Sequence, residues 1–174
     1  MMVQRAIDRT PVPWKNGLGV QYEITCDGSL PDDWTWRLST ADITQDVPFS
    51  SFPGVTREFC VADGNGVVLN INGVDHRCEP GSVTTFRGED VVFATLIDGP
   101  MRALNLMVRD GSISRSLRRG AAGQKIGDCL VVVATLAPSI LIIDGEEISL
   151  QILDALIFDS STMVQVIDGV VATN

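Results

Sequence analysis

Short runs of alternating apolar and polar residues, each followed by a turn-forming dipeptide, most constrain what this chain can fold into. Asp63-Gly64, Asn72-Gly73, Pro80-Gly81 and Asp98-Gly99 follow one another in this way. Such dipeptides favour tight turns, and a β-strand places alternate side chains on opposite faces. No segment shows the 3.6-residue spacing of an amphipathic helix. The sequence therefore predicts an all-β protein, with a further turn region from Asp27 to Asp33.

An internal repeat indicates that the chain has two related barrel-like halves. Four residues recur with the same displacement of 72 positions: Leu69, Ile71, Gly73 and Phe86 return as Leu141, Ile143, Gly145 and Phe158. Stretches of this kind arise when one structural unit is duplicated. The second copy lacks the arginines, the tryptophans and the Pro-Phe-Ser turn of the first. Any binding site is therefore expected in the first half.

A polar, basic and glycine-rich segment separates the two halves. It contains Gly120, Gly123 and Gly127 and is followed by renewed apolar strands. Glycine-rich polar stretches are typical of linkers. We therefore expect a first half at residues 1–112, a linker at 113–128 and a smaller second half at 129–174.

The overall charge excludes one class of partner. The net charge of −9 and the pI near 4.4 argue against nucleic acid, because phosphate binding needs a basic face. No apolar run reaches the roughly 20 residues of a membrane span, and no apolar leader follows Met1. The four cysteines are widely spaced and form no C-x-x-C pair. We expect a cytoplasmic protein with free thiols and no membrane partner.

The stretch from Trp36 to Phe59 is the strongest candidate for a binding site. Strand alternation places Arg37 on the face opposite Trp36, and Arg57 follows a turn rich in Pro, Ser and Phe. Guanidinium groups beside aromatic rings can form part of a pocket for a small anion. The other interpretation is that both arginines are surface strand residues with ordinary partners.

Three further residues extend this candidate site. Lys15 and Asn16 lie in a loop between Trp14 and Gly17, and Asn105 lies within a strand that is apolar on both faces. A buried amide without a partner would cost about 1–3 kcal/mol, so the backbone or a ligand must bond to Asn105. Together with Arg37 and Arg57, these groups suit the binding of a small carboxylate.

Several catalytic chemistries lack the residues they need. His76, expected in an exposed turn, is the only histidine, so neither a histidine-based nucleophile system nor a metal site is expected, and no cofactor is predicted. No glycine-rich phosphate loop opens onto a helix. Glu23, Asp42, Asp46 and Glu58 lie near the proposed pocket, but their spacing singles out no acid–base pair. The catalytic residues, if there are any, remain unknown.

Several ordered motifs resemble the HutD/Ves family. They span roughly residues 11–109: Pro13-Trp-Lys-Asn-Gly-Leu-Gly19, Trp36-Arg-Leu-Ser39, Pro48-Phe-Ser-Ser-Phe-Pro-Gly54 with Arg57, and Asp98-Gly-Pro100 followed by Leu104-Asn-Leu-Met107. The resemblance implies a cupin-like, RmlC-like jelly roll, with a double-stranded β-helix in each of two halves (bicupin-like). It also implies a part in histidine utilisation, with formylglutamate as a ligand and a regulatory role.

The family motifs carry over to six positions of this sequence. The resemblance implies ligand binding by residues that match them, namely Lys15, Asn16, Arg37, Ser39, Arg57 and Asn105, without a metal. Two positions depart from the family: Leu18 stands where glycine is usual, and Ala103 where an acidic residue often precedes Leu-Asn. The second departure removes a partner for Arg37 or Arg57.

Three functional hypotheses follow. In the first, the protein binds a small anionic metabolite such as formylglutamate or a related intermediate, with a regulatory role. In the second, it is a metal-free isomerase or hydrolase acting on a small carboxylate. In the third, it is an interaction protein whose arginines form structural ion pairs. Exposed sheet edges would also allow a homodimer.

Overall fold

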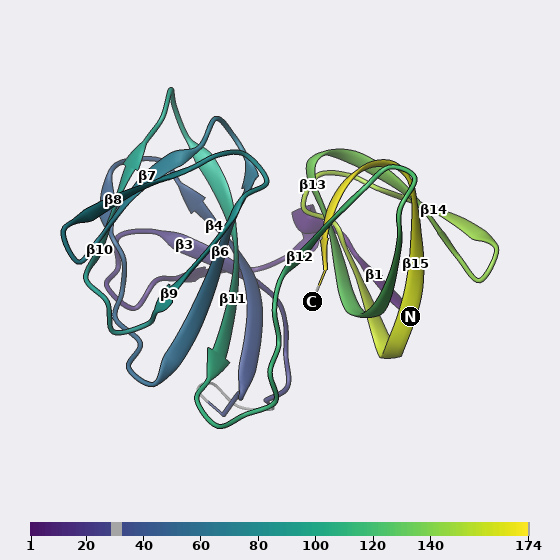
Figure 1. Cartoon of the computed structure of the whole chain (residues 1–174), viewed down its shortest axis with the longest axis horizontal. Coiled ribbons are helices and arrows are strands. Elements are labelled where there is room, and N and C mark those ends of the chain that lie inside the picture. The colour runs from purple at the N-terminus through teal and green to yellow at the C-terminus, as the bar shows by residue number, and fades with distance from the viewer. Residues whose placement is uncertain (29–32, 174) are drawn as a thin grey trace. The chain divides into compact units, whose positions relative to one another are not determined.

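A computed structural model of the protein describes residues 1–28 and 33–173, and almost all of its regular structure is β-strand (Figure 1). The strands are β1 Met2–Gln4, β2 Pro11–Pro13, β3 Val20–Cys26, β4 Trp36–Ile43, β5 Val47–Pro48, β6 Val55–Asp63, β7 Val67–Ile71, β8 Val74–Cys78, β9 Val83–Arg87, β10 Val92–Leu96, β11 Met101–Arg109, β12 Arg118–Ala121, β13 Lys125–Ile143, β14 Glu146–Leu150 and β15 Ala155–Thr173.

This composition confirms the all-β prediction. One short 3-10 helix, η1 (Ala6–Asp8), is the only helical element of the described residues, and no helix in them is long and apolar enough to cross a membrane. Residues 29–32, in the turn region expected between Asp27 and Asp33, lie outside the described residues.

The chain forms two compact units whose boundaries differ from those expected. The larger unit is Thr10–Arg115, and the smaller unit combines Met1–Arg9 with Ser116–Asn174. The first residues lie in the smaller unit because β1 pairs with β15, with Val3 opposite Leu156. The first half expected at 1–112 therefore begins at Thr10.

The segment expected as a linker at 113–128 contains regular structure. It includes β12, which pairs with β15, and the beginning of β13. Gly120 occurs there because of close packing: a Cβ at this position would lie 2.0 Å from Ile126 Cδ1 and 3.0 Å from Val171 Cγ2. The sequence pattern was ambiguous because glycine is used both in flexible linkers and at close approaches.

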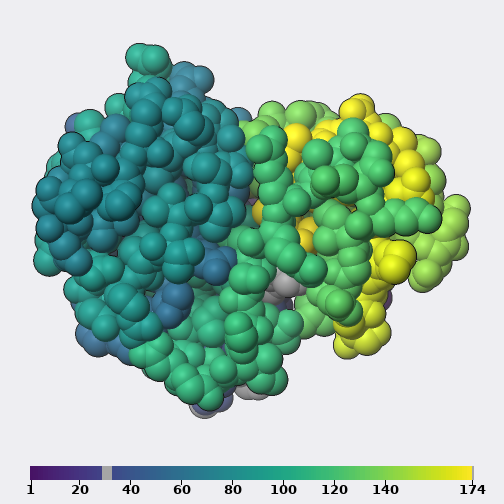
Figure 2. Space-filling view, in the orientation of Figure 1, coloured from purple at the N-terminus to yellow at the C-terminus, as the bar shows by residue number. Residues whose placement is uncertain are grey.

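The larger unit consists of two sheets. The strand order is β2-β3-β4-β11-β6-β9 in the six-stranded sheet and β5-β10-β7-β8 in the four-stranded sheet. One hydrophobic core joins residues of both, including Phe59 and Ala103 from the first and Leu69 and Ala94 from the second, all completely buried. The sheets therefore pack face to face as a sandwich. In the space-filling view of Figure 2, side chains of this unit fill gaps that are open between its strands in Figure 1.

The smaller unit has its own sheet and core. Its sheet has the order β1-β15-β13-β14, with β12 added to β15. The buried carboxylate of Asp154, in the turn before β15, accepts hydrogen bonds from Arg5 Nη1 (2.7 Å), the Ala6 backbone N–H (2.8 Å) and the Gln151 backbone N–H (3.0 Å). The first residues of the chain are thereby fixed to this unit.

Three of the four repeated residues lie in matching hairpins of the two units, whereas Phe86 lies on β9 and Phe158 on β15. In the hairpin β7-β8, Asn72 and Gly73 have φ values of 52° and 88°, and in the hairpin β13-β14, Asp144 and Gly145 have 52° and 84°. Two successive residues with positive φ are the mark of a type I′ turn, which explains the glycine. Leu69 and its counterpart Leu141 are both completely buried.

Candidate functional site

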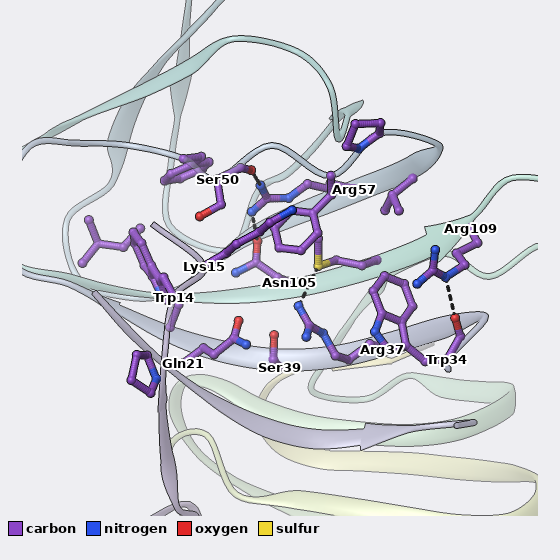
Figure 3. Close-up of a pocket in the computed structure, with 18 residues that line it drawn as sticks. Trp14, Lys15, Gln21, Trp34, Arg37, Ser39, Ser50, Arg57, Asn105 and Arg109 are labelled. Atoms are coloured by element: carbon purple, nitrogen blue, oxygen red, sulfur yellow. Dashed lines mark hydrogen bonds between the residues drawn. The ribbon is translucent and has the colours of Figure 1, made fainter. Parts of the chain in front are cut away.

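A pocket of about 470 Å³ lies in the larger unit (Figure 3). The described residues that line it come from the end of β2 and the loop before β3, from the segment just before β4, from β3, β4, β6 and β11, and from the turn after β5. They are Pro13, Trp14, Lys15, Gln21, Trp34, Arg37, Ser39, Ala41, Ile43, Phe49, Ser50, Phe52, Pro53, Val55, Arg57, Asn105, Met107 and Arg109. The volume falls within the range of small-molecule sites.

Strand register brings the polar side chains together. On β11, Asn105 lies opposite Ser39 of β4, and Met107 lies opposite both Arg37 of β4 and Arg57 of β6. Because side chains alternate along each strand, these residues share the face of the sheet that lines the pocket. The strand order β4-β11-β6 thus places Arg37 on one side of the central strand β11 and Arg57 on the other, as Figure 3 shows.

Arg57 is a buried cation whose partners are neutral. Its side chain donates from Nη2 to Asn105 Oδ1 (3.2 Å) and from Nη1 to the Ser50 carbonyl oxygen (3.4 Å). The guanidinium carbon lies 5.1 Å from the ring centroids of Phe49 and Phe86. No carboxylate among the described residues forms an ion pair with Arg57, and its buried Nε has no hydrogen-bond partner there.

This environment is unfavourable to the charge of Arg57. Burial, with a further contribution from the charge of Arg37, lowers the pKa of Arg57 to about 10. The group remains protonated at neutral pH, so a positive charge persists where only 8% of the residue is exposed. An anion bound beside it would offset the unfavourable burial.

A second group of aromatic and cationic side chains lines another part of the pocket. The guanidinium carbons of Arg37 and Arg109 lie 5.1 and 4.5 Å from the ring of Trp34, within the range of cation–π contacts. Arg37 Nη2 lies 3.2 Å from Met107 Sδ, and Arg109 Nε donates to the Trp34 carbonyl oxygen at 2.7 Å. The interpretation of Arg37 as an ordinary surface residue is therefore not supported, since it is partly buried in the pocket wall.

The two residues expected from the loop before β3 have different positions. Lys15 lines the pocket, with Nζ 5.7 Å from the ring centroid of Phe52. Asn16 is not among the described lining residues; its Nδ2 donates to the Pro48 carbonyl oxygen at 3.1 Å. Five of the six expected positions, namely Lys15, Arg37, Ser39, Arg57 and Asn105, therefore line one pocket.

None of the carboxylates considered for acid–base chemistry is among the described lining residues. Asp42 accepts a hydrogen bond from the Tyr22 hydroxyl, and Asp46 accepts one from the backbone N–H of Leu96. Glu58 is adjacent to Arg57 on β6, so its side chain points to the opposite face. The described lining set thus has four cations and no acid in a chain with a net charge of −9.

The described residues also contain no group of three or more His, Cys, Asp or Glu side chains that could hold a metal ion. His76 lies on the exposed strand β8 rather than in the expected turn. The hydroxyls, amides and cations of the pocket are donors suited to an anion.

Sequence reasoning missed four polar contributors to the pocket: Gln21, Trp34, Ser50 and Arg109. For Arg109 a signal existed, because it follows Asn105 and Met107 at intervals of two on the same strand. For Ser50 there was none, because its contact with Arg57 uses a backbone carbonyl, which any residue would provide.

Comparison with known proteins identifies relatives in Pseudomonas and in enteric bacteria. The uncharacterized 21.2 kDa protein in the hutC 3′ region of Pseudomonas putida is 39% identical over 109 residues, which cover 62% of this chain and 57% of that protein. Protein Ves of Citrobacter koseri is 40% identical over 98 residues, or 55% of this chain and 51% of that one. The chain thus spans about half the length of the curated relatives it matches.

Solved structures extend the similarity to the whole fold. HutD from Pseudomonas fluorescens SBW25, in a formate condition, is 31% identical, with a TM-score of 0.83 over 99% of this chain and 96% of that one. A Cupin 2 conserved barrel protein from Leptotrichia buccalis is 10% identical, with a TM-score of 0.58 over 98% and 97% of the two chains, and shows the fold alone. The jelly-roll prediction is therefore confirmed. Since the HutD family pattern also matches residues 6–171, the chain belongs to the HutD family.

Proposed function

We propose that this protein binds a small anionic metabolite through Arg57, Asn105 and Arg37, and that it acts as a regulatory binding protein rather than an enzyme. Formylglutamate, or a related carboxylate intermediate of histidine utilisation, is the candidate ligand. The resemblance to the HutD/Ves family led to this candidate, and the hutC-region name of the Pseudomonas putida relative agrees with it.

The observation that carries the proposal is the buried charge of Arg57 among neutral partners. A protein that needed this arginine only for its fold would be expected to supply a carboxylate, because an isolated buried charge is costly. The amide of Asn105 orients the guanidinium without neutralising it. Two donors at one edge of a guanidinium match the two oxygens of a carboxylate.

The cations around Phe52 indicate the charge of the ligand. Arg37, Lys15 and Arg57 all lie between 5.7 and 5.9 Å from the ring centroid of Phe52. Several cations around one ring favour a ligand with more than one negative charge, which formylglutamate has. The absence of an acid among the described lining residues favours binding over proton-transfer catalysis.

Isothermal titration calorimetry with formylglutamate, glutarate and formate tests the proposal. We expect wild-type protein to bind at least one of them and Arg57→Met to bind at least about 30-fold more weakly, because truncating a buried hydrogen-bonded charge costs about 2–5 kcal/mol. Arg77→Met is the matched control: Arg77 is exposed on β8, away from the pocket, and pairs with Glu79 at 2.5 Å.

The control variant should bind as the wild type does. Absence of heat with all three compounds at millimolar concentration, or equal affinity of wild type and Arg57→Met, would contradict the proposed function. Release of a product by wild-type protein during these titrations, followed by NMR, would instead support the enzyme hypothesis.

A further inference from the structure

Asn16 joins the loop before β3 to the turn after β5, and both segments line the pocket. Its side-chain Nδ2 donates to the Pro48 carbonyl oxygen at 3.1 Å, and its backbone N–H donates to Ser50 Oγ at 3.3 Å. The neighbours of Asn16 in the loop, Trp14 and Lys15, form part of the pocket wall (Figure 3). We call this pair of hydrogen bonds the Asn16 latch.

The loop that carries the latch is braced internally. The Trp14 backbone N–H donates to the Gly19 carbonyl oxygen at 2.9 Å, and the Leu18 N–H donates to Asn16 Oδ1 at 3.1 Å. Gly19 packs against the indole of Trp14, where a Cβ would lie 2.8 Å from the ring. A segment with its own hydrogen bonds and packing can move as one body.

The turn at the other end of the latch is connected to the buried cation. Ser50 accepts the latch bond with its hydroxyl and accepts the Arg57 Nη1–H with its backbone carbonyl oxygen. A change at Asn16 therefore reaches Arg57 through one residue. The two latch bonds are exposed to solvent, whereas the bond from Arg57 to Asn105 is buried.

We propose that Asn16 is a positioning residue whose latch holds the Pro13–Gly19 loop closed over a bound carboxylate and opens to release it. The inference rests on the proposed function, because the same pocket holds the ligand. Exposed hydrogen bonds are individually weak, so the closed and open loops interconvert readily while the buried Arg57–Asn105 pair stays in place. The latch then sets the residence time of the ligand.

Trypsin gives a test that needs no ligand. Lys15 and Asn16 are exposed, but a protease binds its substrate as an extended chain, so cleavage of the bond between them requires the braced loop to open. Ser50→Ala removes the hydroxyl acceptor and leaves the cleavage site unaltered. We expect cleavage at this bond, measured by mass spectrometry, to be about three- to tenfold faster than in wild type. Ser51→Ala, at an exposed position next to Ser50 in the same turn, should match the wild type.

Stopped-flow fluorescence of Trp14 and Trp34, which both line the pocket, gives the second test. With formylglutamate as probe, Asn16→Ala should raise the dissociation rate constant about tenfold and leave the melting temperature unchanged. Asn65→Ala is the matched control, because Asn65 makes a similar exposed bond to the Asp98 carbonyl oxygen (2.9 Å).

The outcomes separate the two proposals. A dissociation rate constant unchanged by Asn16→Ala, or cleavage unchanged by Ser50→Ala, would overturn the latch while ligand binding by wild type still stands. Absence of binding by the wild type would overturn the proposed function and, with it, the role of the latch in release. Faster cleavage and faster dissociation in the latch variants alone would establish it.

Discussion

Arg57 and Asn105 lie on adjacent strands and are joined by a hydrogen bond of 3.2 Å between Nη2 and Oδ1 inside the pocket. Because the amide oxygen is neutral, the bond fixes the direction of the guanidinium and leaves its charge uncompensated. Four predictions follow from this pair and from the anchoring of the first residues.

Replacing Arg57 should harm binding far more than folding. We expect Arg57→Met to keep the free energy of unfolding within about 2 kcal/mol of wild type, because the lost hydrogen bonds are offset by removal of a buried unpaired charge. Urea unfolding measures this free energy. A loss of about 3–5 kcal/mol would instead assign Arg57 a structural role and support the interaction-protein hypothesis.

A carboxylate placed at residue 105 should pair with Arg57 in place of the carboxylate of the ligand. We expect Asn105→Asp to raise the melting temperature, since the new charge would lie beside Arg57, and to weaken binding of formylglutamate at least about tenfold. Differential scanning calorimetry measures the melting temperature, and isothermal titration calorimetry measures the affinity for formylglutamate. Asn65→Asp adds the same charge on an exposed loop, and equal effects of the two variants would refute the explanation.

Ligand affinity should fall at alkaline pH, because Arg57 loses its proton there. Burial, followed by the charge of Arg37, lowers the pKa of Arg57 to about 10 in the free protein. An anion binds the protonated form, so affinity should be constant between pH 7 and 9 and fall above about pH 10, by roughly tenfold for each pH unit. Over the same range folding stability should rise, because deprotonation relieves the buried charge. Affinity unchanged up to pH 11 would exclude Arg57 as the titrating group.

Asp154 should stabilise the smaller unit in a pH-dependent way. Burial raises its pKa, but hydrogen bonds from the Ala6 N–H, Arg5 and the Gln151 N–H outweigh burial, and the net pKa of Asp154 is lowered. The stabilisation is therefore present above the ordinary pKa of aspartate and is lost as pH falls. We expect Asp154→Asn to lower the free energy of unfolding by about 1–3 kcal/mol at pH 7.

Thermal unfolding at neutral and acidic pH measures the effect of Asp154→Asn, which should disappear in acid. Asp159→Asn is the control, because the Asp159 side chain is 96% exposed and, among the described residues, forms an ion pair only with the terminal amine of Met1, at 3.1 Å. A surface pair of this kind contributes about 0–1 kcal/mol. Equal losses in both variants would argue against a special role for Asp154.

The sequence was sufficient for most strands because turn dipeptides and alternation are local signals. The apolar run between the turns at Asp63-Gly64 and Asn72-Gly73 forms β7, and the apolar strand expected around Asn105 is β11. The alternation also placed Arg37 on the correct face of β4. The sequence did not reveal strands that are defined only by pairing with a neighbouring strand. One of these is β8, whose residues Val74–Cys78 are mostly exposed. A short exposed strand has no apolar pattern and is defined by its pairing with β7.

The candidate site could be predicted only as a set of residue types. Arg57 and Asn105 stood out because a cation and an amide in apolar surroundings need partners. Their pairing with each other required the register between β6 and β11, which the sequence does not encode locally. For Asn16, the loop was correctly identified, but its contact with Pro48 depends on a backbone oxygen 32 residues away.

The pairing of β1 with β15 has a consequence for synthesis of the protein. Residues Thr10–Arg115 form one uninterrupted stretch, so this part can fold on the ribosome as soon as it emerges. Met2–Gln4 is synthesised before this stretch, yet it must wait for Ala155–Ile157 before its strand has a partner. A bulky tag fused next to Met1 should therefore hinder completion of the sheet of the smaller unit and leave the pocket of the larger unit intact.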